Sequence, residues 1–276
     1  MLRFLAARML NGVEWVRGDE YLRTARLGPY AGWFHVHNAP GQRALVVELS
    51  GSLAPAAPGL LARLRHFFDL GARPNVIAER LMRGVLAETV AKNPGLRVPG
   101  AFDGCELAMR AILGQQITVK AATTLAGRFV EAFGEPIHTA HAGLTRLSPT
   151  AERIAVAKVE ELTALGIMPT RAESIIAIGR ELASGRLKLE VGVHPEDAMK
   201  ELVALPGIGR WTAEYIAMRA LRWPDAFPHG DIAVRNSLGG VTATRAEEIA
   251  EAWRPWRSYA TLHLWQDRAW NRDRRA

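Results

Sequence analysis

From about residue 74 to its end, the chain repeats the apolar spacing of amphipathic helices. Five of the segments that carry apolar residues at i, i+3 and i+4 are 74–90, 103–114, 120–133, 151–165 and 171–184. Glycines follow at the points where such helices should stop, as Gly134 and Gly185 do. A succession of helices with one apolar face each must bury those faces against one another. The pattern therefore predicts a large helical lobe over residues 73–276.

Residues 20–50 have a different texture, with β-forming residues clustered between turn signals. The segments EYLRTARL, GWFHVHN and RALVVELS are separated by GPYAG and APGQ. They predict a short antiparallel meander of three strands, with helices at 3–10 and 56–68 beside it. The expected fold class is therefore α+β, with a small antiparallel-sheet lobe over residues 1–72 followed by the helical core.

Composition narrows the functional classes. The chain has one cysteine, Cys105, which excludes a disulfide framework and any four-cysteine zinc or iron–sulfur site within one chain. No apolar run reaches the roughly 18 residues needed to span a bilayer. The first ten residues lack a signal-peptide cleavage pattern, so we expect a cytoplasmic protein.

The charge balance favours a polyanionic partner. Lysine and arginine number 35 against 28 acidic residues, a net charge of +7, and all but five of the 35 are arginine. Arginine makes forked, charge-assisted bonds to phosphate. Arginine-rich codon usage would give the same excess, so charge alone leaves both explanations open.

The most specific stretch is LVALPGIGRWTAEYIAMRALRW, residues 202–223. A helix ending near Ala204 meets Pro206-Gly207-Ile208-Gly209, and a second helix starts at about Arg210. Two glycines one residue apart permit a sharp turn and a close approach to a ligand. The N–H groups of the second helix's first turn then form a phosphate cradle. An ordinary helical-hairpin turn is the simpler alternative, although the full string is uncommon.

This segment resembles the helix–hairpin–helix of a DNA glycosylase superfamily, with the motif at residues 198–222. In that superfamily an aspartate lies about twenty residues further on, in the loop that enters the next helix. Here PHGDIAVRN places Asp231 there, at the end of a loop over residues 224–231. The resemblance implies that Asp231 is the catalytic residue. An aspartate before a helix is also a common N-cap, and Asp231 can serve as both.

Trp211 stands where relatives that also cleave the DNA backbone carry a nucleophilic lysine. The resemblance therefore implies a monofunctional hydrolase without lyase activity. The segments FLAAR, FDLGARPNVI, RAILGQQITV and WRPWRSYATLHLW also resemble the DNA-3-methyladenine glycosylase II (AlkA-type) family. That family begins with a strand ahead of FLAAR, so either the start codon is misassigned or the first lobe lacks its first strand.

The resemblance implies that the protein, as a monomer, flips alkylated purines such as 3-methyladenine and 7-methylguanine out of double-stranded DNA and hydrolyses their glycosidic bonds. Asp231 would stabilise the cationic sugar. An N-alkylated purine is cationic, which suits aromatic faces. The base pocket is implied to be lined by Trp211, Tyr215 and Trp265. We expect Trp253, Trp256 and Trp270 to be core residues and His229 to be a surface loop histidine, and leave Tyr259 undecided.

The same resemblance implies DNA contacts and one ion. Gln116 is expected to fill the gap left by the flipped base. No cofactor is expected to be required, but the carbonyls of Val203, Leu205 and Gly207 are implied to hold a monovalent cation, Na⁺ or K⁺; only the resemblance supports this. The implied DNA-binding residues are Gly207, Gly209, Arg210, Thr212, Gln115 and Gln116.

Two other functions stay open. A non-catalytic helix–hairpin–helix module would grip phosphate and leave Asp231 and the tryptophans incidental. An oxidised-guanine glycosylase also pairs a small sheet lobe with this helical core, although Trp211 in place of lysine argues against it.

Overall fold

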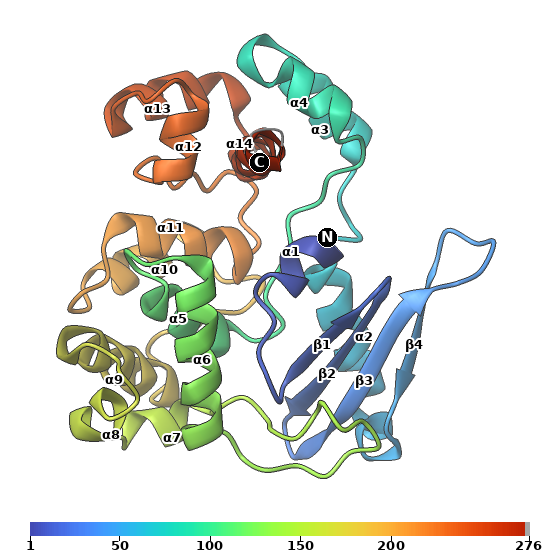
Figure 1. Cartoon of the computed structure of the whole chain (residues 1–276), viewed down its shortest axis with the longest axis vertical. Helices are drawn as coiled ribbons and strands as arrows, with labels where there is room; N and C mark the ends of the chain where they lie inside the picture. Colours follow the sequence, from blue (N-terminus) through green and yellow to red (C-terminus); the bar gives the residue numbers. More distant parts are fainter. Residues whose placement is uncertain (274–276) are drawn as a thin grey trace. The chain divides into compact units, whose positions relative to one another are not determined.

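The computed structural model describes residues 1–273, with side chains described as far as residue 266 (Figure 1). The strands are β1 (Glu14–Arg17), β2 (Glu20–Leu27), β3 (Tyr30–Asn38) and β4 (Leu45–Leu49). The helices are α1 (Leu2–Ala6), α2 (Ala57–Phe67), α3 (Pro74–Leu81), α4 (Ala87–Lys92), α5 (Gly104–Leu113), α6 (Val119–Phe133), α7 (Ala151–Ala155), α8 (Val159–Thr163), α9 (Pro169–Ala183), α10 (Pro195–Val203), α11 (Arg210–Arg219), α12 (Ile232–Ser237), α13 (Ala243–Ala250) and α14 (Arg257–Asp273). Three short 3₁₀ turns are η1 (Gly51–Ala56), η2 (Gly84–Leu86) and η3 (Glu251–Trp253).

The sheet is an antiparallel meander in the order β1-β2-β3-β4. The α+β prediction is confirmed, but the prediction of three strands was wrong because β1 was missed. That strand is four residues long and begins and ends with a charged residue. Such a segment is too short to display the alternation on which strand prediction depends.

The two faces of the sheet are covered by different parts of the chain. On one face α2 lies against β2, where Gly59 approaches the side chain of Leu27. The other face is crossed by the segment between α6 and α7, whose His141 ring lies edge-on to Trp33 at 4.4 Å (Figure 1). Tyr21 and Phe34, neighbours on β2 and β3, are almost fully buried.

A buried cluster of charges joins the sheet to α5. Arg23 of β2 is 2% exposed and pairs with Glu14 of β1 at 3.1 Å and with Glu106 of α5. Arg110 reaches the other oxygen of Glu14 at 3.0 Å. Burial by itself would raise the pKa of Glu106, but the two guanidinium groups outweigh it and lower that pKa to about 2. Since each charge has a partner, the cluster fixes where the sheet meets the helix.

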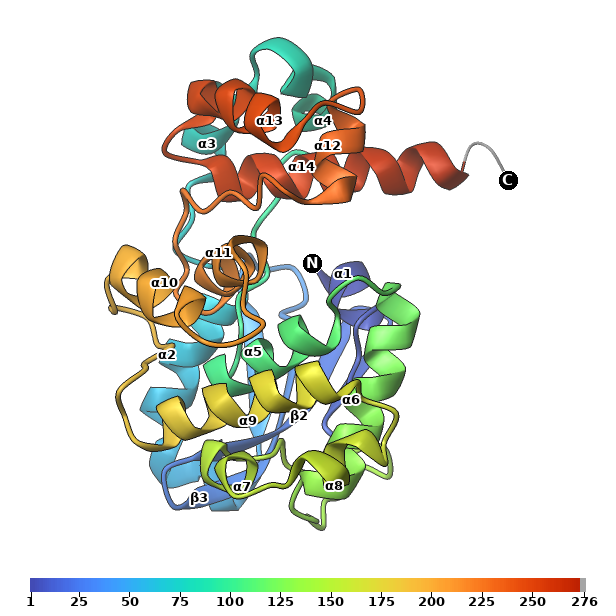
Figure 2. The same ribbon diagram turned by 90° about the vertical axis from the view of Figure 1, so that its left-hand side faces the viewer.

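Two predicted helices are broken in the structure. The segment over residues 74–90 divides into α3, η2 and α4, and the segment over residues 151–165 divides into α7 and α8. Both short helices α7 and α8 pack on α9, which runs across them (Figure 2). Apolar spacing continues across each break, which is why periodicity alone predicted one helix.

The chain forms two compact units. The first comprises Met1–Leu64, Cys105–Lys188 and Leu205–Gly207, and the second comprises Arg65–Gly104, Leu189–Ala204 and the residues from Ile208 onward. This grouping differs from the predicted division at residue 72, because α5 to α9 group with the sheet. Among the described residues, no helix has the length and apolar character that crossing a membrane requires.

The second unit is braced around Asp69. Its carboxylate accepts a hydrogen bond from the hydroxyl of Tyr259 at 2.9 Å and pairs with Arg222. Tyr259, left undecided from the sequence, is 4% exposed, and burial followed by the Asp69 charge raises its pKa. It is a structural residue that holds α14 to the segment preceding α3.

Candidate active site and DNA-binding hairpin

Helices α10 and α11 form the predicted hairpin, joined by a turn that contains Gly207. Gly207 has a φ of +72°, and a Cβ atom there would lie 2.2 Å from Ser174 Oγ. Gly209 differs, because its φ is −86° and it is the N-cap of α11 without a side-chain cap. Only Gly207 therefore needs glycine for its backbone. The first N–H groups of α11 belong to Arg210 and Trp211, and helix N-termini of this kind bind anions.

Two side chains predicted to bind DNA, Arg210 and Thr212, are ion-paired or buried within the protein. Arg210 donates to Glu214 at 3.1 Å and to Glu247 at 2.6 Å. Thr212 is 2% exposed, so its side chain is not presented at the surface. The predicted contacts of Arg210 and Thr212 with DNA remain predictions. For Arg210 they would require the pair with Glu247 to open.

The two glutamines after α5 have separate environments. Gln115 donates its side-chain amide to the carbonyl oxygen of Gly207 at 2.9 Å, and its own carbonyl accepts from Arg171. It therefore braces the hairpin turn, which is a different contact from the predicted one with DNA. Gln116 is exposed, has a φ of +54° and lies in the turn between α5 and α6. Its role in filling the gap left by a flipped base stays a prediction.

Asp231 is fixed at both carboxylate oxygens. As the N-cap of α12 it accepts from the backbone N–H of Val234 at 2.9 Å on Oδ1. The indole N–H of Trp265 donates to the same oxygen at 3.2 Å, and that of Trp211 donates to Oδ2 at 3.1 Å. Both readings from the sequence, an N-cap and a group beside the aromatic cluster, thus apply to one side chain. It is half-buried.

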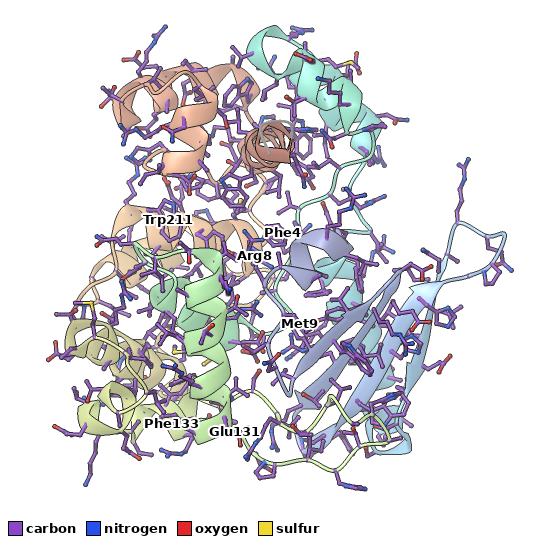
Figure 3. All side chains as sticks on the ribbon, in the orientation of Figure 1. Phe4, Arg8, Met9, Glu131, Phe133 and Trp211 are labelled. Atoms are coloured by element: carbon purple, nitrogen blue, oxygen red, sulfur yellow. The ribbon has the colours of Figure 1, made fainter. Side chains whose placement is uncertain are left out.

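The three predicted pocket aromatics lie together. Trp211, on α11 (Figure 3), stacks on Tyr215 one turn later with ring centroids 5.5 Å apart and planes within 9°. Trp265 of α14 lies 6.3 Å from the Tyr215 ring at 45°. A purine between two parallel rings needs about 7 Å, twice the contact distance between carbon atoms. Trp211 and Tyr215 therefore present an outer face for stacking and leave no slot between their rings.

The loop over residues 224–231 is fastened to the start of α14. Asp225 is buried and pairs with Arg257 at 2.8 Å, while Ser258 donates to the carbonyl of Ala226 at 3.0 Å. Trp253, 3% exposed, packs edge-on to Phe227 and is the core residue that was expected. Trp256 is half-buried. The side chain of Trp270 lies outside the described part of the chain.

Sequence reasoning missed two members of the site and misplaced a third. His229 was expected to be a surface loop residue, but its side chain is 16% exposed and its Nδ1 lies 3.4 Å from Glu214 Oε2. Glu214 is 5% exposed and Glu247 pairs with Arg210. The signal was present: Glu214 is three residues from Trp211 and four from Arg210, so all three share one side of a helix. The spacing Thr244-x-x-Glu247 is that of a capping box, but the N-cap of α13 is Thr242.

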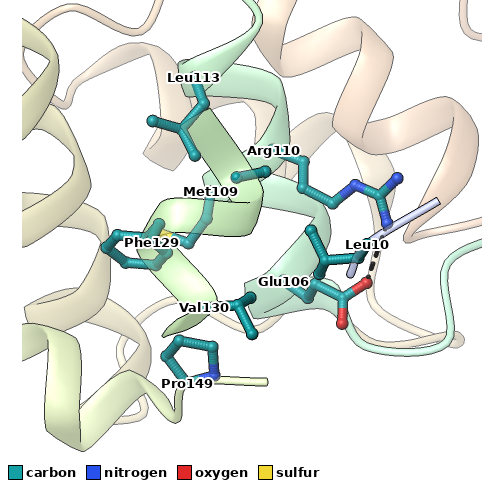
Figure 4. A pocket seen from close by; sticks show the side chains of 9 residues that line it. Leu10, Glu106, Met109, Arg110, Leu113, Phe129, Val130 and Pro149 are labelled. Carbon is teal, nitrogen blue, oxygen red and sulfur yellow. Dashed lines mark hydrogen bonds and ion pairs between the residues drawn. The ribbon is translucent and has the colours of Figure 1, made fainter. Parts of the chain in front are cut away.

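A small pocket elsewhere in the chain does not resemble a ligand site. It lies between α5 and α6, and its lining is mostly apolar, with Met109, Leu113 and Phe129 among the side chains (Figure 4). Its polar groups, Glu106 and Arg110, are bonded to each other at 3.3 Å. They also belong to the charge cluster that joins the sheet to α5.

Comparison with known proteins identifies the family to which this chain belongs. A family model described as the AlkA N-terminal domain matches residues 1–103, and one described as "HhH-GPD superfamily base excision DNA repair protein" matches residues 109–258. The chain belongs to the HhH-GPD superfamily. Asp231 and the hairpin both lie within the matched range of that superfamily.

Individual relatives are similar in sequence to nearly the whole of this chain. It is 37% identical over 273 residues to DNA-3-methyladenine glycosylase 2 of Escherichia coli, covering 99% of this chain and 94% of the relative. It is 41% identical to a probable bifunctional transcriptional activator/DNA repair enzyme AlkA of Mycobacterium tuberculosis, and it spans about half of that protein, 53%. The structure of a 3-methyladenine DNA glycosylase from Archaeoglobus fulgidus superposes with a TM-score of 0.83 at 26% identity, covering 96% of this chain and 92% of that one.

Proposed function

We propose that this protein is a monofunctional DNA glycosylase of base excision repair that hydrolyses the N-glycosidic bond of alkylated purines in duplex DNA. The observation that carries the proposal is the carboxylate of Asp231, which two indole N–H groups and a helix N-terminus hold beside a stack of aromatic rings. The relatives named for 3-methyladenine removal support the substrate class.

The chemistry follows from what each group can do. A base must leave the duplex to reach a half-buried carboxylate, at a cost of a few kcal/mol. Stacking on an aromatic face stabilises the flipped base by about 1–3 kcal/mol. Cation–π attraction adds about 0.5–2 kcal/mol for a methylated, cationic purine. As the bond breaks, Asp231 would stabilise the positive charge that develops on the sugar.

Selectivity then comes mainly from the leaving group. A free-energy difference of about 1.4 kcal/mol changes a rate tenfold. The pocket's preference for a cationic base therefore favours alkylated over ordinary purines by a factor of only some tens. Alkylation makes a purine a better leaving group, so an ordinary base that enters the pocket still fails to react. We therefore expect a broad range of alkylated purines to be released.

The hairpin carbonyls suit a monovalent cation in their chemistry, because Val203, Leu205 and Gly207 offer neutral oxygen donors within five residues. One of them, Gly207, also accepts the hydrogen bond from Gln115; a carbonyl oxygen has a second lone pair to offer. A bound cation would supply positive charge for a DNA phosphate. We expect no other cofactor, and we expect a cytoplasmic monomer.

The proposal is tested by incubating the protein with DNA methylated by an alkylating agent, in a chelating buffer, and identifying the bases released. We expect free 3-methyladenine and 7-methylguanine, with strands that stay intact until alkali is added. Binding without release would favour the non-catalytic hairpin module. Strand cleavage without alkali would favour a lyase of the oxidised-guanine type, against the expectation from Trp211.

A further inference from the structure

A histidine–carboxylate contact lies directly beside the proposed catalytic group. His229 precedes Asp231 by two residues, and its Nδ1 lies 3.4 Å from Glu214 Oε2. Both side chains are largely buried, with exposed fractions of 16% and 6%. A contact at the edge of hydrogen-bonding distance that is shielded from water needs a reason, because a loop histidine is more easily accommodated in solvent.

The contact fastens the catalytic turn to α11 at a second point. The backbone N–H of Asp231 donates to the carbonyl of Pro228 at 2.8 Å, which closes a turn with His229 inside it. Asp231 is held to α11 through Trp211, and His229 is held to it through Glu214. Since Trp211 and Glu214 are three residues apart, they lie on the same side of the helix. Without the His229 contact, Trp211 would be the remaining one of these two links between the turn and α11.

The charges around Glu214 suit this role. Burial raises the pKa of the Glu214 carboxyl, while His229 and Arg210 counteract that effect. Arg210 is in turn paired with Glu247, which gives an ordered row of acidic and basic groups along α11 and α13. Glu214 Oε1 accepts from Arg210, and Oε2 faces His229. Without His229, a buried carboxylate oxygen would lose that partner.

We propose that the His229–Glu214 pair is a positioning device that sets the orientation of the Asp231 carboxylate under the sugar of the flipped nucleotide. The proposal rests on the proposed glycosylase function and adds two residues to its site. Neither residue is assigned contact with the substrate. A misplacement of about 1 Å in a reacting group can slow a reaction by about a hundredfold, so a contact that does no chemistry can still control the rate.

The test compares His229→Ala with His229→Asn. The amide nitrogen of asparagine can take the place of Nδ1 as a donor, whereas alanine has none. We expect His229→Ala to release 7-methylguanine about ten to a hundred times more slowly than the parent under single-turnover conditions at saturating protein. His229→Asn should recover to within about threefold of the parent rate. The Kd for duplex DNA carrying a stable abasic analogue should stay within about twofold for both.

Glu214→Gln supplies the other half of a double-mutant cycle. Arg210 and His229 face different oxygens of Glu214, and glutamine keeps an acceptor oxygen at only one of those two positions. If the two side chains act as a pair, His229→Ala combined with Glu214→Gln should be no slower than the slower single variant. His37→Asn is the matched control, since His37 also lies 3.4 Å from a glutamate, Glu48, on the surface of the sheet. It should match the parent in rate and in Kd.

The outcomes separate the two proposals. A parent protein that releases no base overturns the proposed function and the pair with it. An active parent with His229→Ala equally fast, or with His229→Asn as slow as His229→Ala, overturns the positioning role alone. A double variant whose fold reduction in rate is the product of the two single reductions would also overturn the positioning role, because independent residues have multiplicative effects.

Discussion

At the scale of single residues, this site is organised by hydrogen bonds to one carboxylate. Asp231 takes a backbone N–H and two indole N–H groups, and each has a different consequence. The backbone bond starts α12, so it would be present in a protein with no activity. The indole bonds are less easily explained as structure alone, because they orient the carboxylate next to rings suited to a cationic base.

Trp211→Phe separates the indole bond from the aromatic face. Phenylalanine keeps a ring that can stack on Tyr215 but has no N–H for Asp231. A hydrogen bond to a charged group is worth about 1.5–3 kcal/mol, so release of 7-methylguanine should slow by about ten to a hundredfold. Single-turnover rates measure this, with Trp33→Phe on strand β3 as the control. A Trp211→Phe variant as fast as the parent would show that the indole bond does not orient the carboxylate for catalysis.

The burial of His263 makes the stability of the fold depend on pH. It lies on α14, is 4% exposed, and burial lowers its pKa from 6.5 to about 4. The unfolded chain therefore binds a proton between pH 6.5 and 4 that the folded protein does not. Because of this difference, the free energy of unfolding is highest above pH 6.5 and declines as the pH falls. At pH 5 it is lower by about 2 kcal/mol.

Urea unfolding at pH 7.5 and pH 5 measures that decline, and His263→Gln is the comparison. The variant should lose this part of the pH dependence, because glutamine does not titrate. An equal loss of stability in both proteins at pH 5 would mean that other groups account for it.

At the scale of elements, the hairpin depends on a turn that only one of its glycines makes possible. Gly207→Ala would introduce a Cβ at a positive φ and within 2.2 Å of Ser174 Oγ. Left-handed backbone alone costs a residue with a side chain about 1–2 kcal/mol. The free energy of unfolding should fall by at least that amount, and binding to duplex DNA should weaken because the first turn of α11 shifts.

Gly209→Ala is the matched comparison for stability. Its φ is ordinary, and a Cβ there meets nothing within 4 Å. Urea unfolding should show a smaller loss of stability for this variant than for Gly207→Ala, since alanine is a poorer N-cap than glycine but introduces no backbone strain here. Equal losses for both variants would mean that the turn does not depend on the conformation of Gly207.

At the scale of the whole molecule, the sequence predicted the α+β class, the hairpin and the surroundings of Asp231. These rest on local signals: apolar periodicity, a glycine turn and the spacing of two motifs. It did not predict the short strand β1, the breaks at α3–α4 and α7–α8, or the contacts of Arg210. Those depend on packing between segments far apart in the chain, such as Arg210 with Glu247 across 37 residues. His229 was misread for the same reason, because its burial is set by α11.

The most direct test of the account is Asp231→Asn. Asparagine has the size of aspartate and still offers one oxygen to Val234, so the fold and the affinity for DNA should be retained. Without the negative charge, release of 3-methyladenine and 7-methylguanine from methylated DNA should fall by about three orders of magnitude. A folded Asp231→Asn protein that binds DNA and releases methylated purines at the parent rate would contradict the account.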